Sequence, residues 1–154
     1  MHMRREELAK MIDHTLLDPS TTRYRVERLC EEAKTYRVHA VCVNPSWVSF
    51  AAGSLRGSGV KVSSTVGFPL GASLTEVKAF EAAAVIRLGA SEVDMVINIG
   101  ALKSQDLAAV RKDIEQVVKA SEGLPVKVII ETAYLNEQEK VQACKLAQEA
   151  GAAF

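Results

Sequence analysis

Two charged residues interrupt apolar segments of this sequence, and together they could form a reactive site. Asp94 lies within residues 92–98 (EVDMVIN), and Lys127 lies within residues 126–132 (VKVIIET). Both segments are short, rich in β-branched residues and preceded by glycine or proline, which is typical of buried parallel strands. A lone charge in such a strand costs several kcal/mol unless it is paired. We therefore expect Asp94 and Lys127 to face each other.

Each of these two residues has two interpretations when the residues alone are considered. Asp94 is either a general acid/base or one half of a structural ion pair. Lys127 would be a nucleophile if burial lowered its pKa. A neighbouring carboxylate would instead raise the pKa of Lys127 and keep the amine charged. We expect the second situation, with Lys127 as the charged partner of Asp94.

The elements that position these residues alternate between strand and helix. Apolar segments predict strands at 12–17, 40–44, 61–66, 92–98 and 126–132. Helical patterns predict a short N-terminal helix at 4–11 and longer helices at about 22–36, 46–55, 74–88, 105–121 and 137–150. Capping-box spacing places the helix starts at Ser73 with Glu76 and at Asn136 with Glu139. This rhythm predicts one α/β domain, residues 1–154, with a parallel sheet.

Two closures of a parallel sheet compete. An open doubly wound sheet usually has a glycine-rich phosphate-binding turn after its first strand, and residues 17–19 (LDP) are not one. A (βα)8 barrel places polar residues inside, at the carboxyl ends of its strands. If Asp94 faces the inside of the barrel, alternation along the strands gives the same orientation to six further residues: Asp13, Thr15, Cys42, Asn44, Lys127 and Glu131. We predict a (βα)8 TIM barrel of which this sequence supplies the first five βα units, a partial barrel, with His14 facing outward.

Composition excludes several classes of partner. Acidic and basic residues number 19 each, so no basic face for nucleic acid is expected. No apolar segment approaches the roughly 20 residues of a membrane span, and the N-terminus lacks a signal core. The cysteines at 30, 42 and 144 are odd in number and far apart, which favours a reducing, cytoplasmic location. His2 and His39 fall in terminal or loop positions, so no metal site is expected.

Five segments arrive in a characteristic order: IDHTLL at 12–17, VCVNP at 41–45, VGFPLG at 66–71, EVDMV at 92–96 and KVIIET at 127–132. Together they closely resemble the deoxyribose-phosphate aldolase family, and the resemblance covers nearly the whole chain. It implies a class I aldolase, a lyase, on a (βα)8 barrel. Such enzymes act in deoxyribonucleotide catabolism. They cleave 2-deoxyribose 5-phosphate into acetaldehyde and glyceraldehyde 3-phosphate through a lysine Schiff base, without a cofactor.

The resemblance also implies roles for particular residues. Asp94 matches the acid/base aspartate of the family, and Lys127 matches the lysine beside it on strand five. Cys42 matches a cysteine that lines the pocket, and Asp13 with Thr15 matches a polar pair on strand one that contributes to substrate binding. Carbinolamine and enamine formation both move protons, which is work suited to a positioned carboxylate.

One family motif is missing from this sequence. The family's Schiff-base lysine lies in a Lys-Thr-Ser-Thr-Gly-Phe motif on strand six, and the sequence reaches Phe154 without it. The first expectation is therefore an aldolase sequence truncated before its nucleophile, with the fragment itself inactive. A second is a non-catalytic homo-oligomer in which partial barrels cover each other's strand edges. A third is a different barrel enzyme that uses Lys127 as its Schiff-base lysine.

Overall fold

The strands form a single parallel sheet in sequence order. The computed structural model describes residues 3–154, so His2 lies outside the described part of the chain. The order is β1-β2-β3-β4-β5, and every neighbouring pair is parallel. The strands are β1 (Asp13–Leu16), β2 (Ala40–Val43), β3 (Lys61–Val66), β4 (Glu92–Val96) and β5 (Val126–Ile129). The predicted strands and their parallel arrangement are confirmed.

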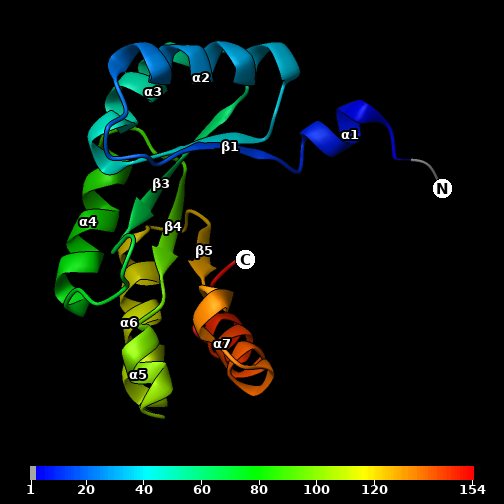
Figure 1. The fold of residues 1–154 in the computed structure, drawn as a ribbon. Coiled ribbons are helices and arrows are strands. Elements are labelled where there is room, and N and C mark those ends of the chain that lie inside the picture. The colour runs from blue at the N-terminus through cyan, green and yellow to red at the C-terminus, as the bar shows by residue number, and fades with distance from the viewer. Residues whose placement is uncertain (1–2) are drawn as a thin grey trace.

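Helices connect successive strands and lie around the outside of the sheet (Figure 1). They are α1 (Arg5–Ala9), α2 (Arg23–Tyr36), α3 (Val48–Ser54), α4 (Thr75–Arg87), α5 (Ile99–Lys103), α6 (Leu107–Ala120) and α7 (Glu137–Glu149), with short 3₁₀ turns η1 (Pro45–Trp47) and η2 (Thr132–Tyr134). This is the arrangement of five consecutive βα units of a barrel. None of the helices within residues 3–154 has the length and apolar character needed to cross a bilayer.

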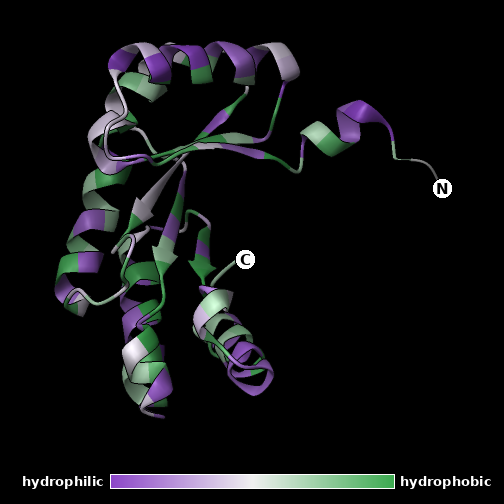
Figure 2. Cartoon of the chain, in the orientation of Figure 1, coloured by the Kyte–Doolittle hydropathy of each residue, from purple (hydrophilic) through white to green (hydrophobic). Residues whose placement is uncertain are grey.

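The apolar core lies between the strands and the surrounding helices. Val41, Val93 and Met95 on the strands and Ile114 and Val117 on α6 have no exposed surface. Figure 2 shows hydrophobic residues along the strands and polar residues over much of the outer helical surface. Burial of one such side chain contributes about 1.5–3 kcal/mol, so this interface is the main source of stability. The other face of the sheet carries the polar residues.

The sheet is strongly curled. β1 and β5 are not paired with each other, yet the Lys127 Nζ atom lies 2.6 Å from the Asp13 Oδ2 atom. A flat five-stranded sheet would hold its outer strands roughly 19 Å apart, since neighbouring strands are about 4.8 Å apart. The curvature is therefore that of a barrel wall. Beyond β5, the Ala153 N–H donates to the Val126 carbonyl at 2.8 Å, which adds the last residues to that edge.

One of the two predicted capping boxes is confirmed. The Asn136 side chain accepts a bond from the Glu139 N–H, and the Glu139 carboxylate accepts one from the Asn136 N–H, both at 2.9 Å. The box predicted at Ser73 is wrong, because Leu74 is the N-cap of α4 and no side chain caps it. The N–H groups of Val77 and Lys78 bond to the Leu74 carbonyl at 3.0 and 3.1 Å.

The end of β4 also differs from the prediction. The strand was expected to continue to Asn98, but it ends at Val96, and α5 follows at once. The Asn98 side chain accepts a hydrogen bond from the Ala101 N–H at 3.0 Å and so caps α5. An asparagine at this position favours a helix start over continuation of a strand.

Candidate active site

The inner face of the sheet brings Asp94 and Lys127 together. Asp94 is paired in register with Thr65 of β3 on one side and with Lys127 of β5 on the other. Residues paired in register across parallel strands point to the same face, so both charged side chains lie inside. Asp94 is 6% exposed. The predicted juxtaposition of the two charges is confirmed.

Lys127 bridges two carboxylates. Its ammonium group lies 2.6 Å from the Asp13 Oδ2 atom and 3.2 and 3.3 Å from the two oxygens of Asp94. Burial alone would lower the pKa of Lys127, but the two carboxylates outweigh it and hold the pKa above its ordinary value. The amine is therefore charged at neutral pH. This geometry favours Lys127 as a charged partner and argues against it as a nucleophile.

The thiol of Cys42 lies on the other side of Asp94. Its Sγ atom donates to the Asp94 Oδ2 atom at 3.6 Å, and the residue is 3% exposed. Burial raises the pKa of Cys42 to about 12, with the negative charge of Asp94 as the next cause. Because only the thiolate is a good nucleophile, Cys42 lines the site as a neutral, unreactive group.

The remaining predicted inner residues lie at the edge of this cluster or outside it. The Thr15 hydroxyl is exposed and donates to the backbone carbonyl of Asp13 at 2.9 Å. The Asn44 side chain donates to the Leu17 carbonyl at 3.1 Å and ties together the ends of β1 and β2. Alternation placed Glu131 inside, with a solvated strand end as the alternative. β5 ends at Ile129, so the alternation does not extend to Glu131, which is partly buried and has a left-handed backbone. His14 faces outward as predicted and lies 2.9 Å from the Glu32 carboxylate on α2.

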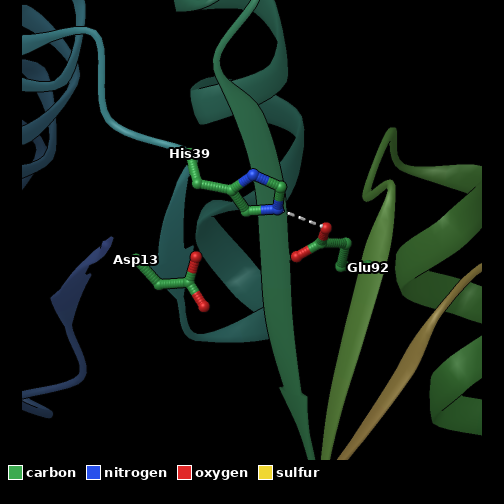
Figure 3. Close-up of side chains that lie close together, drawn as sticks. All are labelled: Asp13, His39 and Glu92. Atoms are coloured by element: carbon green, nitrogen blue, oxygen red, sulfur yellow. Dashed lines mark hydrogen bonds and ion pairs between the residues drawn. The ribbon is translucent and has the colours of Figure 1, made fainter. Parts of the chain in front are cut away.

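A second charged group lies on the same face and was not predicted. The Glu92 carboxylate contacts the His39 Nε2 atom at 2.8 Å and the Lys61 ammonium group at 3.1 Å. Figure 3 shows the side chains of Asp13, His39 and Glu92 close together. Their potential ligand atoms lie within 4.8 Å of one another. Alternation could have revealed Glu92, because it lies two residues before Asp94. His39 was interpreted only as a loop residue.

The charges around this group decide whether it fits a metal ion. One imidazole and two carboxylates are a ligand set that zinc accepts. Here, however, Lys127 occupies an oxygen of Asp13 and Lys61 occupies an oxygen of Glu92. Two ammonium groups already balance the two carboxylates and would repel a cation. The cluster fits an ion network along the inner face better than a metal centre.

Two buried hydroxyls complete the inner face. Ser63 and Thr65 on β3 are at most 1% exposed, and their hydroxyl oxygens have no hydrogen-bond partner among residues 3–154. Register places Thr65 beside Asp94 and Ser63 beside Cys42. Buried hydroxyls are normally hydrogen-bonded, so these two offer bonding capacity to a molecule that enters the face.

The fold and the site together define a class of protein. Five βα units of a barrel carry an inner carboxylate that has a charged lysine on one side and a neutral thiol on the other. The chain is therefore part of a (βα)8 barrel with a charged cluster on its inner face.

Comparison with known proteins identifies the family. The family model described as "DeoC/LacD family aldolase" matches residues 8–154. The "Deoxyribose-phosphate aldolase" of Enterococcus faecalis is 57% identical over 149 residues, which are 96% of this chain and 68% of that protein. The protein of the same name from Aciduliprofundum boonei is 55% identical over 150 residues. The chain belongs to the DeoC/LacD family of aldolases.

Solved structures agree with this assignment. A structure described as a "putative deoxyribose-phosphate aldolase from Coccidioides immitis" matches with a TM-score of 0.94 and 39% identity, over 97% of this chain and 59% of that one. The tetrameric deoxyribose phosphate aldolase of Aeropyrum pernix matches with a TM-score of 0.88 and 34% identity, over 97% of this chain and 63% of that one. This chain therefore spans about two thirds of its curated relatives and somewhat less of these solved chains.

Proposed function

We propose that this sequence belongs to a deoxyribose-phosphate aldolase, which cleaves 2-deoxyribose 5-phosphate into acetaldehyde and glyceraldehyde 3-phosphate through a lysine Schiff base. The observation that carries the proposal is the contact between Asp94 and Lys127 on the inner face. The name and high identity of the relatives support the choice of substrate.

Asp94 is the proposed general acid/base. Formation of the imine requires a proton on the departing hydroxyl of the carbinolamine. Loss of the proton from the 3-hydroxyl then breaks the C2–C3 bond, which releases glyceraldehyde 3-phosphate and leaves an enamine that takes up a proton on carbon. A carboxylate that accepts and returns a proton serves these steps. The Lys127 ammonium group lies 3.2 Å from the Asp94 carboxylate and provides a positive charge beside it.

Residues 1–154 are proposed to supply the acid/base half of the reaction. Lys127 is protonated between two carboxylates, so another lysine is needed as the nucleophile. The family resemblance places that lysine in a Lys-Thr-Ser-Thr-Gly-Phe motif, which the printed sequence does not contain. Asp13 holds Lys127, Cys42 lines the pocket, and Thr15 at the edge is a proposed contact for the sugar phosphate.

A chimaera tests this division of labour. Residues 1–154 are joined to the remaining third of the Enterococcus faecalis relative, and glyceraldehyde 3-phosphate release is measured. We expect the chimaera to be active, and Asp94→Asn to lower kcat about 10²–10⁴-fold. Glu32→Gln, which removes a carboxylate from the outer face, is the matched control and should retain activity. An Asp94→Asn chimaera with the unmodified rate would refute the role of Asp94.

Borohydride trapping separates the two lysine hypotheses. The 154-residue protein and the chimaera are incubated with acetaldehyde and borohydride, which makes an imine permanent, and their intact masses are compared. We expect an adduct only in the chimaera, at a residue beyond position 154. An adduct that maps to Lys127 in the 154-residue protein would instead support a distinct enzyme that uses Lys127 as nucleophile.

We also propose that the protein forms a homo-oligomer, and a non-catalytic oligomeric partial barrel is the alternative function. The specific observation is that β1 pairs only with β2 within residues 3–154, beside the exposed apolar residues Leu8, Met11 and Ile12. The tetrameric state of the Aeropyrum pernix structure supports association in the family. A cytoplasmic location is proposed with it, because all three cysteines are free thiols.

A further inference from the structure

A buried ion pair joins α4 to α6. The Lys78 ammonium group donates to the Asp113 Oδ2 atom at 2.6 Å, and the side chains are 0% and 4% exposed. Removing two charges from water carries a large desolvation cost, and two apolar residues of similar size often hold helices equally well. Stability alone therefore does not explain why charged residues occupy these two positions.

Lys78 makes a second bond, and this one reaches the sheet. Its Nζ atom donates to the Val96 carbonyl at 2.9 Å. Val96 is the last residue of β4, two residues after Asp94. The pairing of β3 with β4 extends only to Val66 with Met95, so the Val96 carbonyl lies just beyond the end of that ladder. Lys78 thus provides the donor that the neighbouring strand no longer supplies.

The same helix also holds the end of β3. The Gly67 N–H donates to the Glu81 carboxylate on α4 at 2.8 Å. Gly67 has φ +64°, and a Cβ atom there would lie 2.8 Å from the Cε atom of Lys78. The Lys78 stem is therefore packed directly against the turn that follows β3. Two side chains of α4 therefore fix the carboxyl ends of β4, which carries Asp94, and of its neighbour β3.

We propose that Lys78 is a positioning residue for the acid/base site. Its bond to the Val96 carbonyl holds the end of β4 in place, and this keeps the Asp94 carboxylate against Lys127. Asp113 keeps the Lys78 ammonium group in place and balances its charge. The inference rests on the proposed function for the role of Asp94. Its test uses the geometry of the site and requires no aldolase activity, so the two proposals can fail separately.

The test compares two variants of the 154-residue protein. Lys78→Met with Asp113→Leu removes both charges together and also removes the donor to Val96. Asp113→Asn removes the charge partner but leaves the Lys78 amine able to donate to Val96. The readouts are amide hydrogen exchange at Ile97, whose N–H bonds to the Ile129 carbonyl beside this edge, and the titration of the ¹³C-labelled Lys127 side chain.

We expect the double variant to fold, to exchange the Ile97 amide about 10-fold faster and to show a lower Lys127 titration midpoint, because a charged partner has moved away. Asp113→Asn should leave the midpoint unchanged even if it lowers stability. As a control, Arg111→Met removes the exposed pair with Glu149 between α6 and α7 and should change neither readout.

Either variant can overturn the proposal. A folded double variant with unchanged exchange at Ile97 and an unchanged Lys127 midpoint would show that the pair is only structural. If the double variant does not fold, Asp113→Asn decides. In that variant the Val96 bond is retained, so a shifted Lys127 midpoint would contradict the proposed role of that bond, and an unchanged midpoint would support it.

Discussion

The Asp94 carboxylate lies between one neutral and one charged neighbour, and this asymmetry defines its chemistry. Cys42 is held as a thiol by burial and by the charge of Asp94 itself, with a pKa of about 12. Lys127 is held as an ammonium ion by Asp13 and Asp94 against the opposing effect of burial. The carboxylate thus has a compensating positive charge beside it, without a second titrating group near neutral pH.

The cysteines should differ strongly in reactivity. Cys144 is exposed, whereas Cys30 and Cys42 are buried and burial raises the pKa of both thiols. We expect iodoacetamide at pH 8 to label Cys144 only, because little thiolate forms at the other two. Intact mass and peptide mapping measure this result, and labelling in urea at all three cysteines is the control. Rapid labelling of Cys42 in the folded protein would contradict the buried, uncharged thiol.

Replacement of Lys127 should destabilise the protein in a pH-dependent way. Lys127→Met leaves Asp13 and Asp94 without their counter-charge. We expect the free energy of unfolding to fall by about 2 kcal/mol at pH 8, which is less than for a fully buried ion pair because the Lys127 side chain is partly exposed. The pKa of Lys127 is higher in the folded state than its ordinary value of 10.5. The contribution of Lys127 to stability is therefore complete below pH 10.5 and is lost as the pH rises through the pKa of the folded state.

Urea unfolding from pH 7 to pH 11 measures this dependence. The difference in unfolding free energy between the unmodified protein and Lys127→Met should be constant below the ordinary pKa of 10.5 and begin to shrink as pH rises above it. Lys112→Met, at an exposed position on α6, is the matched control and should show almost no difference. A difference that grows as pH rises toward 10.5 would mean that the pKa of Lys127 is lowered in the folded state.

At the scale of elements, the loop after β3 is fitted closely to the end of β4. The Gly71 N–H bonds to the Gly67 carbonyl at 2.8 Å, which closes the loop. Gly71 has φ +66°, and a Cβ atom there would overlap the backbone carbonyl of Ile97. The loop and the end of β4 therefore support each other beside the site, and α4 holds both through Lys78 and Glu81.

Substitution of Gly71 tests this contact. Gly71→Ala should lower the unfolding free energy by about 3 kcal/mol, because it combines a left-handed backbone with a backbone collision. Gly57→Ala is the matched control, since Gly57 has φ +76° but a Cβ atom added there would meet nothing within 4 Å. We expect that control to cost only about 1 kcal/mol in urea unfolding. Equal losses at both positions would remove the evidence for close packing at Gly71.

At the scale of the whole molecule, the outer edge of β1, which has no strand partner among residues 3–154, should promote self-association. We expect the sedimentation coefficient of the 154-residue protein to rise with concentration, because an open strand edge with apolar neighbours pairs with another chain. Ile12→Lys places a charge beside this edge and should weaken association, whereas Val141→Lys on the distant α7 should not. A monodisperse, folded monomer at all concentrations would rule out the oligomer proposal.

Several features of the fold and site were predictable because they are local. Alternation within a strand has a period of two, so the apolar segments around Asp94 and Lys127 specified both the strands and the face on which the charges lie. The cost of an unpaired buried charge then predicted that Asp94 and Lys127 would meet. The capping box at Asn136 is equally local, because its two hydrogen bonds join residues three positions apart.

Only the tertiary structure decided the contacts that depend on curvature and helix packing. Asp13 and Lys127 are 114 positions apart in sequence and meet because the sheet curls, which no strand pattern specifies. Lys78, on a helix, has the sequence appearance of a solvated lysine, and its burial follows from the packing of α4 against α6 and β4. Within the strands, the sequence by itself determined which residues face inward, because that depends on neighbours along the chain. The structure decided which of them touch, because that depends on elements brought together from distant positions.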